Sequence, residues 1–171
     1  MKSGKAVKME TNMEIPNKQG NREVTLDING HTFLIDFARR RILPKGDENS
    51  TGIPFRVFKT HFMEKTDRCE IPYDTKKHEF VKMDYRTVTA VPENVILVAF
   101  PHLDRMAPTE YSVMGGWARE DFEPLEGQQN HFTATILKGE SNWLDKLAKI
   151  NQAEQKLPQI NSSRRSRQMG R

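Results

Sequence analysis

Six consecutive apolar residues, Val95 to Phe100, limit the fold of this chain more than any other feature of its sequence. Pro92 and Pro101 bound the run on either side. Apolar runs of this length between chain-breaking residues are typical of strands. A strand that is apolar at every position has both of its faces covered. The run therefore predicts a buried strand at the centre of a sheet.

A β-hairpin is predicted close to the start of the chain. Asn29 and Gly30 tolerate the positive φ angles that a two-residue hairpin turn requires. Apolar and polar residues alternate on both sides of this pair, as they do in strands with one buried face. The alternating apolar residues are Val24, Leu26 and Ile28 before the turn and Phe33, Ile35 and Phe37 after it.

Three further segments show weaker strand patterns. Residues 53–62 are rich in apolar side chains, but their period slips near Val57, which is typical of a β-bulge. Residues 80–91 and 132–137 alternate less regularly and predict two more strands. Residues 67–77 are polar and contain turn-forming residues, so they predict a connection rather than a strand.

Two helices are predicted in the second half of the chain. Pro108 suits the first turn of a short helix that ends at Gly115-Gly116. A longer helix is predicted over residues 141–157, because Ser141 is a suitable N-cap and Pro158 stops the helix.

One face of the longer helix is apolar. It carries Trp143, Leu147, Ile150 and Leu157. An apolar stripe with helical spacing is most simply a face that packs on the core. The alternative is that this face binds a partner.

These elements predict a strand-dominated α+β fold in a single domain of residues 21–158. The strands of residues 21–137 form an antiparallel or mixed sheet, and the amphipathic C-terminal helix closes it. The hairpin start and the lack of repeated strand–helix–strand units argue against a doubly wound fold. Residues 1–20 show no sustained period and predict a flexible N-terminal arm.

The positive charge of the chain is concentrated at its C-terminal end. Residues 159–171, the predicted disordered basic tail, contain no acidic residue and have a charge of +4. The whole chain has 27 basic and 23 acidic residues, so residues 1–158 hold 23 of each. This distribution predicts a near-neutral body with polycationic ends, in place of a basic nucleic-acid-binding fold. The cations of the tail are Arg164, Arg165, Arg167 and Arg171.

The tail arginines and a second cluster, Arg39, Arg40 and Arg41, are the predicted nucleic-acid-binding residues. The tail has no aromatic residue for base stacking, so we expect its contacts to reach phosphates and to weaken with salt. Consecutive arginines on a strand point to opposite faces, so the second cluster forms one patch only where the chain turns.

The pattern most like an active-site fragment directly follows the buried strand. In an extended chain His102 and Asp104 share a face, and the carboxylate could orient the imidazole as a general base. Arg105 beside them is a candidate for holding an anion. The simpler interpretation is that these polar residues bring the end of a buried strand to water.

No metal site and no cofactor are predicted. The five histidines lack the short mutual spacing of helical and finger-type zinc sites. A site assembled from His61, Cys69 and His78 is an alternative that the sequence leaves open. Residues 3–5 read Ser-Gly-Lys but lack the glycine spacing of a phosphate loop, so nucleotide binding is not indicated.

The sequence predicts a cytoplasmic protein that does not enter a membrane. It has no run of about 18 apolar residues. No apolar segment of the kind found in signal peptides follows the lysines near its start. Cys69 is its single cysteine, which excludes an intramolecular disulfide and fits a reducing compartment.

These observations together predict a non-enzymatic binding or accessory module. We expect its core to contact a protein partner and its basic tail to add non-specific nucleic-acid attachment. One alternative is a small hydrolytic enzyme that uses His102 and Asp104. Another is a self-assembling structural protein whose arms contact nucleic acid. The identity of the partner and the oligomeric state stay open.

Overall fold

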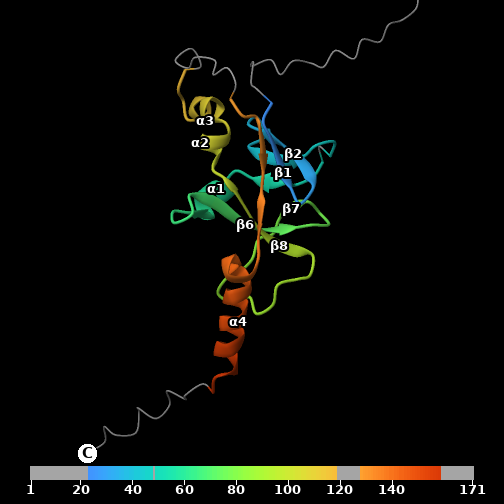
Figure 1. Cartoon of the computed structure of the whole chain (residues 1–171), viewed down its shortest axis with the longest axis vertical. Helices are drawn as coiled ribbons and strands as arrows, with labels where there is room; N and C mark the ends of the chain where they lie inside the picture. The colour runs from blue at the N-terminus through green and yellow to red at the C-terminus, as the bar shows by residue number, and fades with distance from the viewer. Residues whose placement is uncertain (1–22, 48, 119–127, 159–171) are drawn as a thin grey trace, which may run out of the picture.

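The computed structural model describes residues 23–47, 49–118 and 128–158 of the chain (Figure 1). The predicted flexible arm and the predicted disordered tail lie outside these residues. The elements in chain order are β1 (Thr25–Ile28), β2 (His31–Asp36), β3 (Arg41–Pro44), β4 (Ile53–Pro54), α1 (Val57–Thr60), β5 (Phe62–Met63), β6 (Arg68–Asp74), β7 (Glu79–Phe80), β8 (Val95–Pro101), α2 (Leu103–Met106), α3 (Pro108–Met114), β9 (His131–Thr133), β10 (Thr135–Leu137), the 3-10 helix η2 (Gly139–Ser141) and α4 (Trp143–Lys156).

The strands form two sheets. The first has the order β4-β3-β2-β1-β9 and is mixed, because β1 and β9 are parallel. The second has the order β10-β8-β6-β5, with β7 also paired to β6, and its pairs are antiparallel. The predicted strand-rich α+β class with a C-terminal helix is therefore confirmed.

The predicted hairpin is β1 and β2. Its register pairs Ile28 with His31 across the turn. Asn29 and Gly30 have φ angles of 50° and 83°, so both occupy the left-handed region that a tight hairpin turn requires. The inward residues, among them Leu26 and Phe33, are fully buried.

The predicted central strand is β8, which lies between β10 and β6. Its partner β6 was not predicted, because Pro72 and Asp74 are typical of turns. The prediction of a turn-rich connection is wrong there: Cys69, Ile71 and Tyr73 alternate as core residues of a seven-residue strand. The Pro72 carbonyl accepts a hydrogen bond from Val81 N–H at 3.0 Å.

The predicted strand over residues 53–62 is also wrong. The chain instead forms β4, the one-turn helix α1 and β5. The period slip near Val57 marks this helical turn and not a bulge, since His61 N–H donates to Val57 O at 2.8 Å. Of the predicted strand over residues 80–91, only its first residue is strand, as part of β7.

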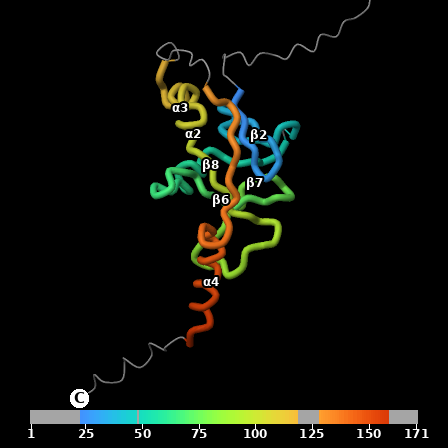
Figure 2. Tube along the Cα trace, in the orientation of Figure 1, coloured from blue at the N-terminus to red at the C-terminus, as the bar shows by residue number. Residues whose placement is uncertain are grey.

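Residues 131–137 join the two sheets. The predicted weak strand of residues 132–137 is present but is divided at the buried Ala134, with β9 in the first sheet and β10 in the second. Ala134 N–H donates to Asp27 O at 2.8 Å. In Figure 2 this segment runs as one orange stretch along both sheets. The main core lies between them, where Phe33 of the first sheet contacts Tyr73 of the second edge-on at 6.0 Å.

The predicted helix after Pro108 is α3, which begins at that proline and is capped by Gly115. The short helix α2 before it was not predicted. Among the described residues, no helix has the length and apolar character needed to cross a membrane.

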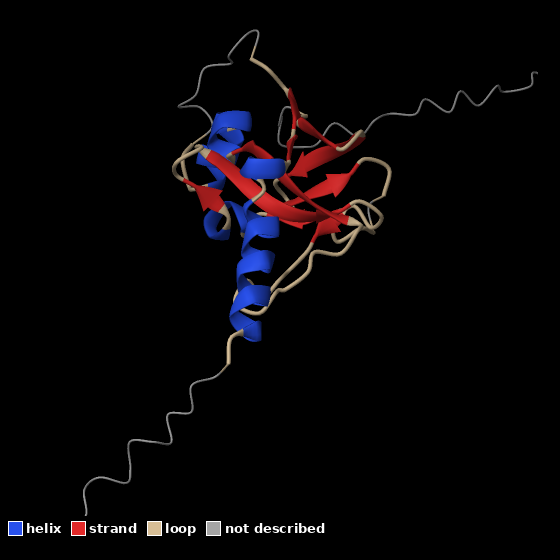
Figure 3. Ribbon diagram, turned by 60° about the horizontal axis from the view of Figure 1, so that its bottom comes forward, coloured by secondary structure: helices blue, strands red, loops and turns tan. Residues whose placement is uncertain are grey.

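The last helix, α4, differs from its prediction at its start and on its buried face. Its N-cap is Asn142 and not Ser141, because η2 occupies residues 139–141 and Asn142 Oδ1 accepts from Asp145 N–H at 3.1 Å. Figure 3 shows the helix extending away from the strands.

The core-packing prediction for the helix stripe is wrong for its C-terminal part. The buried residues are Leu144, Ala148 and Asn151, whereas Ile150 is 54% exposed and Leu157 is 67% exposed. Asn151 is buried because its amide donates to two loop carbonyls, Tyr85 O at 3.1 Å and Val88 O at 2.8 Å.

Gly52 tests the close packing of β3 against the following loop. It has φ of +55°, and a Cβ there would meet the carbonyl oxygen of Ile42 far inside van der Waals contact. We expect Gly52→Ala to lower the free energy of unfolding by about 2–4 kcal/mol, since the left-handed conformation costs about 1 kcal/mol and overpacking adds about 1–3.

Gly139→Ala is the matched control for this substitution. Gly139 has φ of +56°, and a Cβ there would meet nothing within 4 Å. We expect a loss of only about 1 kcal/mol from the conformation itself. Urea denaturation measures both variants. Equal losses would contradict the close backbone approach at Gly52.

Candidate functional site

The structure brings the predicted pair His102 and Asp104 into contact at the start of α2. His102 Nδ1 lies 3.0 Å from Asp104 Oδ1 and accepts the backbone N–H of Asp104 at 3.3 Å. His102 is thus the N-cap of α2. One ring nitrogen cannot both donate to the carboxylate and accept from the backbone N–H, so the tautomer of His102 decides which of these two hydrogen bonds forms.

The surroundings of His102 are aromatic. Its ring meets Phe58, Phe62 and Tyr111 edge-on, at centroid distances of 5.2, 5.5 and 5.4 Å. Arg105 does not join this group, because its guanidinium pairs with Asp67. The arrangement is typical of a capped strand end that packs on the core, and a catalytic role for the pair stays a prediction.

Two of the three arginines in the cluster at residues 39–41 hold local structure. The chain turns at Arg40, which has φ of 54°. Arg39 Nε lies 3.8 Å from Asp36 Oδ2, and Arg41 Nη1 donates to Thr51 O at 2.7 Å. The predicted tail residues Arg164, Arg165, Arg167 and Arg171 lie outside the described residues.

The three residues of the alternative metal site have separate partners. The Cys69 thiol donates to Val57 O, and its burial, followed by the Glu70 charge, raises its pKa to about 12. The His78 ring lies 4.0 Å from the His31 ring by centroid. In the described part of the chain, no three metal-ligating side chains form a group that could hold an ion.

An unpredicted hydroxyl–imidazole–carboxylate chain lies where β1 meets β9. Thr25 Oγ1 is 2.7 Å from His131 Nδ1, and His131 Nε2 is 3.2 Å from Asp27 Oδ2. The His131 side chain is 51% exposed. Hydrolytic triads combine such a chain with an oxyanion hole and a substrate pocket. These contacts alone are typical of polar cross-strand pairs on a sheet surface.

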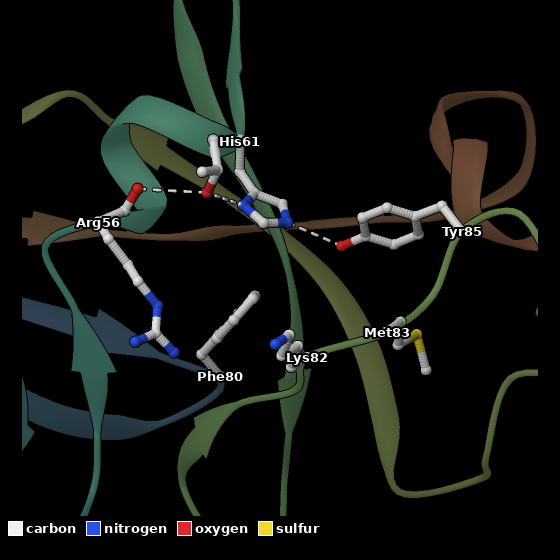
Figure 4. Close-up of a pocket in the computed structure, with 7 residues that line it drawn as sticks. Arg56, His61, Phe80, Lys82, Met83 and Tyr85 are labelled. Atoms are coloured by element: carbon white, nitrogen blue, oxygen red, sulfur yellow. Dashed lines mark hydrogen bonds between the residues drawn. The ribbon is translucent and has the colours of Figure 1, made fainter.

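The structure does contain a pocket, with a volume of about 270 Å³. It lies where the α1 turn meets β7 and the loop that follows it (Figure 4). No acidic side chain is among the seven described residues that line it, and two of the seven are cations. The lining residues are Arg56, Thr60, His61, Phe80, Lys82, Met83 and Tyr85.

A chain of hydrogen bonds fixes one wall of the pocket. Thr60 Oγ1 donates to Arg56 O at 3.2 Å, so this hydroxyl accepts from His61 Nδ1 at 2.7 Å. The other ring nitrogen, His61 Nε2, then carries no proton and accepts the Tyr85 hydroxyl at 2.8 Å. Burial raises the pKa of Tyr85 to about 12, which keeps its hydroxyl proton in place at neutral pH.

This wall is uncharged at neutral pH. Burial lowers the pKa of His61 below its ordinary value of 6.5. The imidazole is therefore neutral, as its two hydrogen bonds also require. The positive charge of the pocket comes from Arg56 and Lys82 alone.

The sequence did not predict this pocket, because its residues come from segments about 20 positions apart. The contact between residues 56–61 and 80–85 depends on β6, and the sequence predicts a connection in place of this strand. A partial signal was present: His61, Phe80 and Tyr85 are aromatic, and cations lie within two residues of Phe80 and within five of His61.

Comparisons with known protein families, with curated proteins and with solved structures give no match for this chain. The functional interpretation therefore depends on the geometry of the chain itself.

The lowered pKa of His61 makes stability depend on pH. Below pH 6.5, the unfolded chain binds a proton at this position that the folded chain does not bind, so stability is full above 6.5 and falls as the pH decreases. We expect the thermal midpoint to decrease from pH 7.5 to pH 5.5. His61→Gln should remove part of that decrease.

His31→Gln is the control, since His31 does not line the pocket. Scanning calorimetry across this pH range measures all three proteins. If the decrease were equally steep in His61→Gln and in the unchanged protein, the neutral, buried state of His61 would be contradicted.

Proposed function

We propose that this protein is a non-enzymatic binding or accessory module. One face of α4 contacts a helical segment of a protein partner, and the basic tail adds contacts to nucleic-acid phosphates. The observation that carries this proposal is the exposed apolar face of α4, which directly precedes the basic tail in the sequence.

The face consists of Leu147, Ile150 and Leu157. Leu147 is half-buried, and Ile150 and Leu157 are 54% and 67% exposed. Leu157 is the C-cap residue of α4 and follows Ile150 by seven positions, so the two lie on the same side of the helix about two turns apart. Large apolar side chains exposed along one side of a helix favour an interaction site.

The spacing supports another helix as the occupant. Residues 147, 150, 154 and 157 follow the alternating three- and four-residue steps of a helix–helix seam, with Glu154 at the one polar position. Lys149 and Lys156 flank this seam one heptad apart and are exposed. A partner helix with apolar residues at the same spacing and acidic residues beside them would complement both features.

The charge distribution supports the nucleic-acid half of the proposal. The tail has a charge of +4 and follows α4 after Pro158, while residues 1–158 are neutral overall. Arginines without neighbouring carboxylates attract phosphates through counterion release, with little dependence on base sequence. The module would thereby hold its protein partner close to nucleic acid.

The α4 face is tested by selecting peptides from a displayed random library on the immobilised full-length protein. We expect selected peptides to share apolar residues at helical spacing with acidic neighbours. Their affinity should fall about tenfold or more in Ile150→Glu and Leu157→Glu, because a charge then faces the apolar seam.

Gln152→Glu adds the same charge on an exposed part of α4 outside the seam and should leave affinity unchanged. Peptides that bind Ile150→Glu as tightly as the unchanged protein would refute the assignment of this face. Light scattering completes the test by measuring the oligomeric state. If the unchanged protein forms dimers that Ile150→Glu dissociates, the occupant of this face is a second copy of this chain and not a partner helix.

The tail is tested by anisotropy with labelled single-stranded RNA and double-stranded DNA at several salt concentrations. Exchanging the four tail arginines for Gln should weaken binding and reduce the salt slope by up to about 3 for RNA and about 4 for DNA, since up to four phosphate contacts are lost. The thermal midpoint should stay nearly unchanged.

The control exchanges the four lysines of residues 1–20 for Gln, because this removes the same charge from a segment that also contains two acidic residues. We expect this control to lose less affinity for RNA and DNA than the chain in which the tail arginines are exchanged. Equal affinity at low salt with and without the tail arginines would eliminate the nucleic-acid half of the proposal.

A further inference from the structure

We propose that the pocket between α1, β7 and the loop after β7 binds a single nucleotide. Its base would lie against Phe80, and its phosphate would be neutralised by Arg56 and Lys82, which lie on either side of that ring. This inference goes beyond the proposed function, because it concerns residues of the folded body and does not depend on the tail or on the α4 face.

The two cations are available for a ligand. Arg56 and Lys82 are both exposed at the pocket, and within the described residues neither side chain has a hydrogen bond or ion pair. Some other cations of the described residues have partners, such as Lys45 with Glu23 and Lys146 with Glu140. Arginine presents a planar fork and lysine a compact charge, and each of them binds the oxygens of a phosphate.

Between the cations lies an aromatic surface. Figure 4 shows the Phe80 side chain between those of Arg56 and Lys82, with His61 and Tyr85 on the other side of the pocket. The His61 ring meets Phe80 edge-on at 5.1 Å and Tyr85 edge-on at 5.8 Å. Aromatic side chains next to cations are the usual contacts of a nucleotide, since the base stacks while the phosphate is neutralised.

The remaining polar groups of the pocket do not repel an anion. The His61 and Thr60 groups are bonded to each other and to Arg56 O and the Tyr85 hydroxyl. None of the described lining residues is acidic. A negative ligand therefore meets two cations and a neutral wall.

The size of the pocket limits the ligand. Its volume of about 270 Å³ is slightly below the range of about 300–1,000 Å³ for pockets that hold drug-sized molecules. One nucleotide is consistent with this size, and a dinucleotide cofactor is not. The nucleotide has two sources with the same chemistry, a free mononucleotide and one residue of a single strand.

The test is calorimetric titration of the full chain with AMP at low ionic strength. We expect saturable binding that Arg56→Gln and Lys82→Gln each weaken about tenfold or more. Lys59→Gln is the matched control, because Lys59 is an exposed cation of α1 that does not line the pocket. The affinity of Lys59→Gln for AMP should equal that of the unchanged protein.

The base contact is tested with ribose 5-phosphate, which lacks the base. Phe80→Leu should weaken the binding of AMP about tenfold and leave the binding of ribose 5-phosphate unchanged. Adenosine and inorganic phosphate should each bind more weakly than AMP. Thermal midpoints identify any variant that has lost its fold. If Phe80→Leu unfolds, Arg56→Gln and Lys82→Gln still test the pocket, because both residues are exposed.

Three outcomes would overturn the proposal. They are no AMP binding at millimolar concentration, equal weakening by Lys59→Gln and Arg56→Gln, and inorganic phosphate that binds as tightly as AMP. Any of these leaves the proposed function standing if the tail arginines still bind RNA.

The two sources are separated with a short oligoadenylate and the chain in which the four tail arginines are Gln. If this chain binds the oligomer more tightly than AMP, and Arg56→Gln weakens both, the pocket holds one residue of a strand. If AMP binds at least as tightly as the oligomer, the pocket holds a free nucleotide. Both results support a nucleotide pocket.

Discussion

The pairing of β6 with β8 is the contact on which the rest of the structure depends. Seven residue pairs join the two strands, from Arg68 with Pro101 to Asp74 with Val95. One face of the pair carries Ile71 and Phe100 into the main core, and on the other face Leu97 and Ala99 pack against α4 and the loop after β7. Coverage on both faces explains why β8 is apolar along its length.

The pocket is tied to this strand pair through α4. Glu70 of β6 is buried, and its carboxylate accepts the Trp143 indole N–H at 2.8 Å and the Thr66 hydroxyl at 3.0 Å. A buried carboxylate without such donors would cost several kcal/mol, so these bonds fix where α4 begins. The Trp143 ring then meets Tyr85 edge-on at 5.4 Å, and Tyr85 holds His61. The pocket wall is therefore positioned by the core.

The sequence predicts elements whose signals are local. The Asn29-Gly30 turn, the apolar run of β8 and the proline start of α3 each need only neighbouring residues to be recognised. The strand β6 could not be found this way, because Pro72 and Asp74 favour turns, and Asp74 does accept the amides of residues 76 and 77 in the turn that ends β6. The ladder of seven residue pairs with β8, which is distant in the sequence, makes the segment a strand.

The distinction between signals from neighbouring residues and contacts made only in the fold also applies to the candidate sites. The sequence places His102 and Asp104 on one face of an extended chain, whereas in the structure they meet as the N-cap and a first-turn residue of the helix α2. The buried face of α4 was misjudged because Asn151 is polar, and only its bonds to two loop carbonyls allow it to be buried. The pocket was missed because no short motif contains it, and nucleotide binding was not indicated by the sequence. Exposed cations beside an aromatic side chain become visible only when the fold brings both segments together.

The central claim is that the folded body has a ligand site of its own, separate from the exposed face of α4 and from the basic tail. Amide chemical shifts of the 15N-labelled full chain, recorded during titration with AMP, test it most directly. The account predicts saturable shifts for residues 56–61 and 80–85, with the amides of the exposed end of α4, residues 152–157, unchanged. Shifts confined to residues 159–171, or spread evenly over the exposed cations, would contradict it.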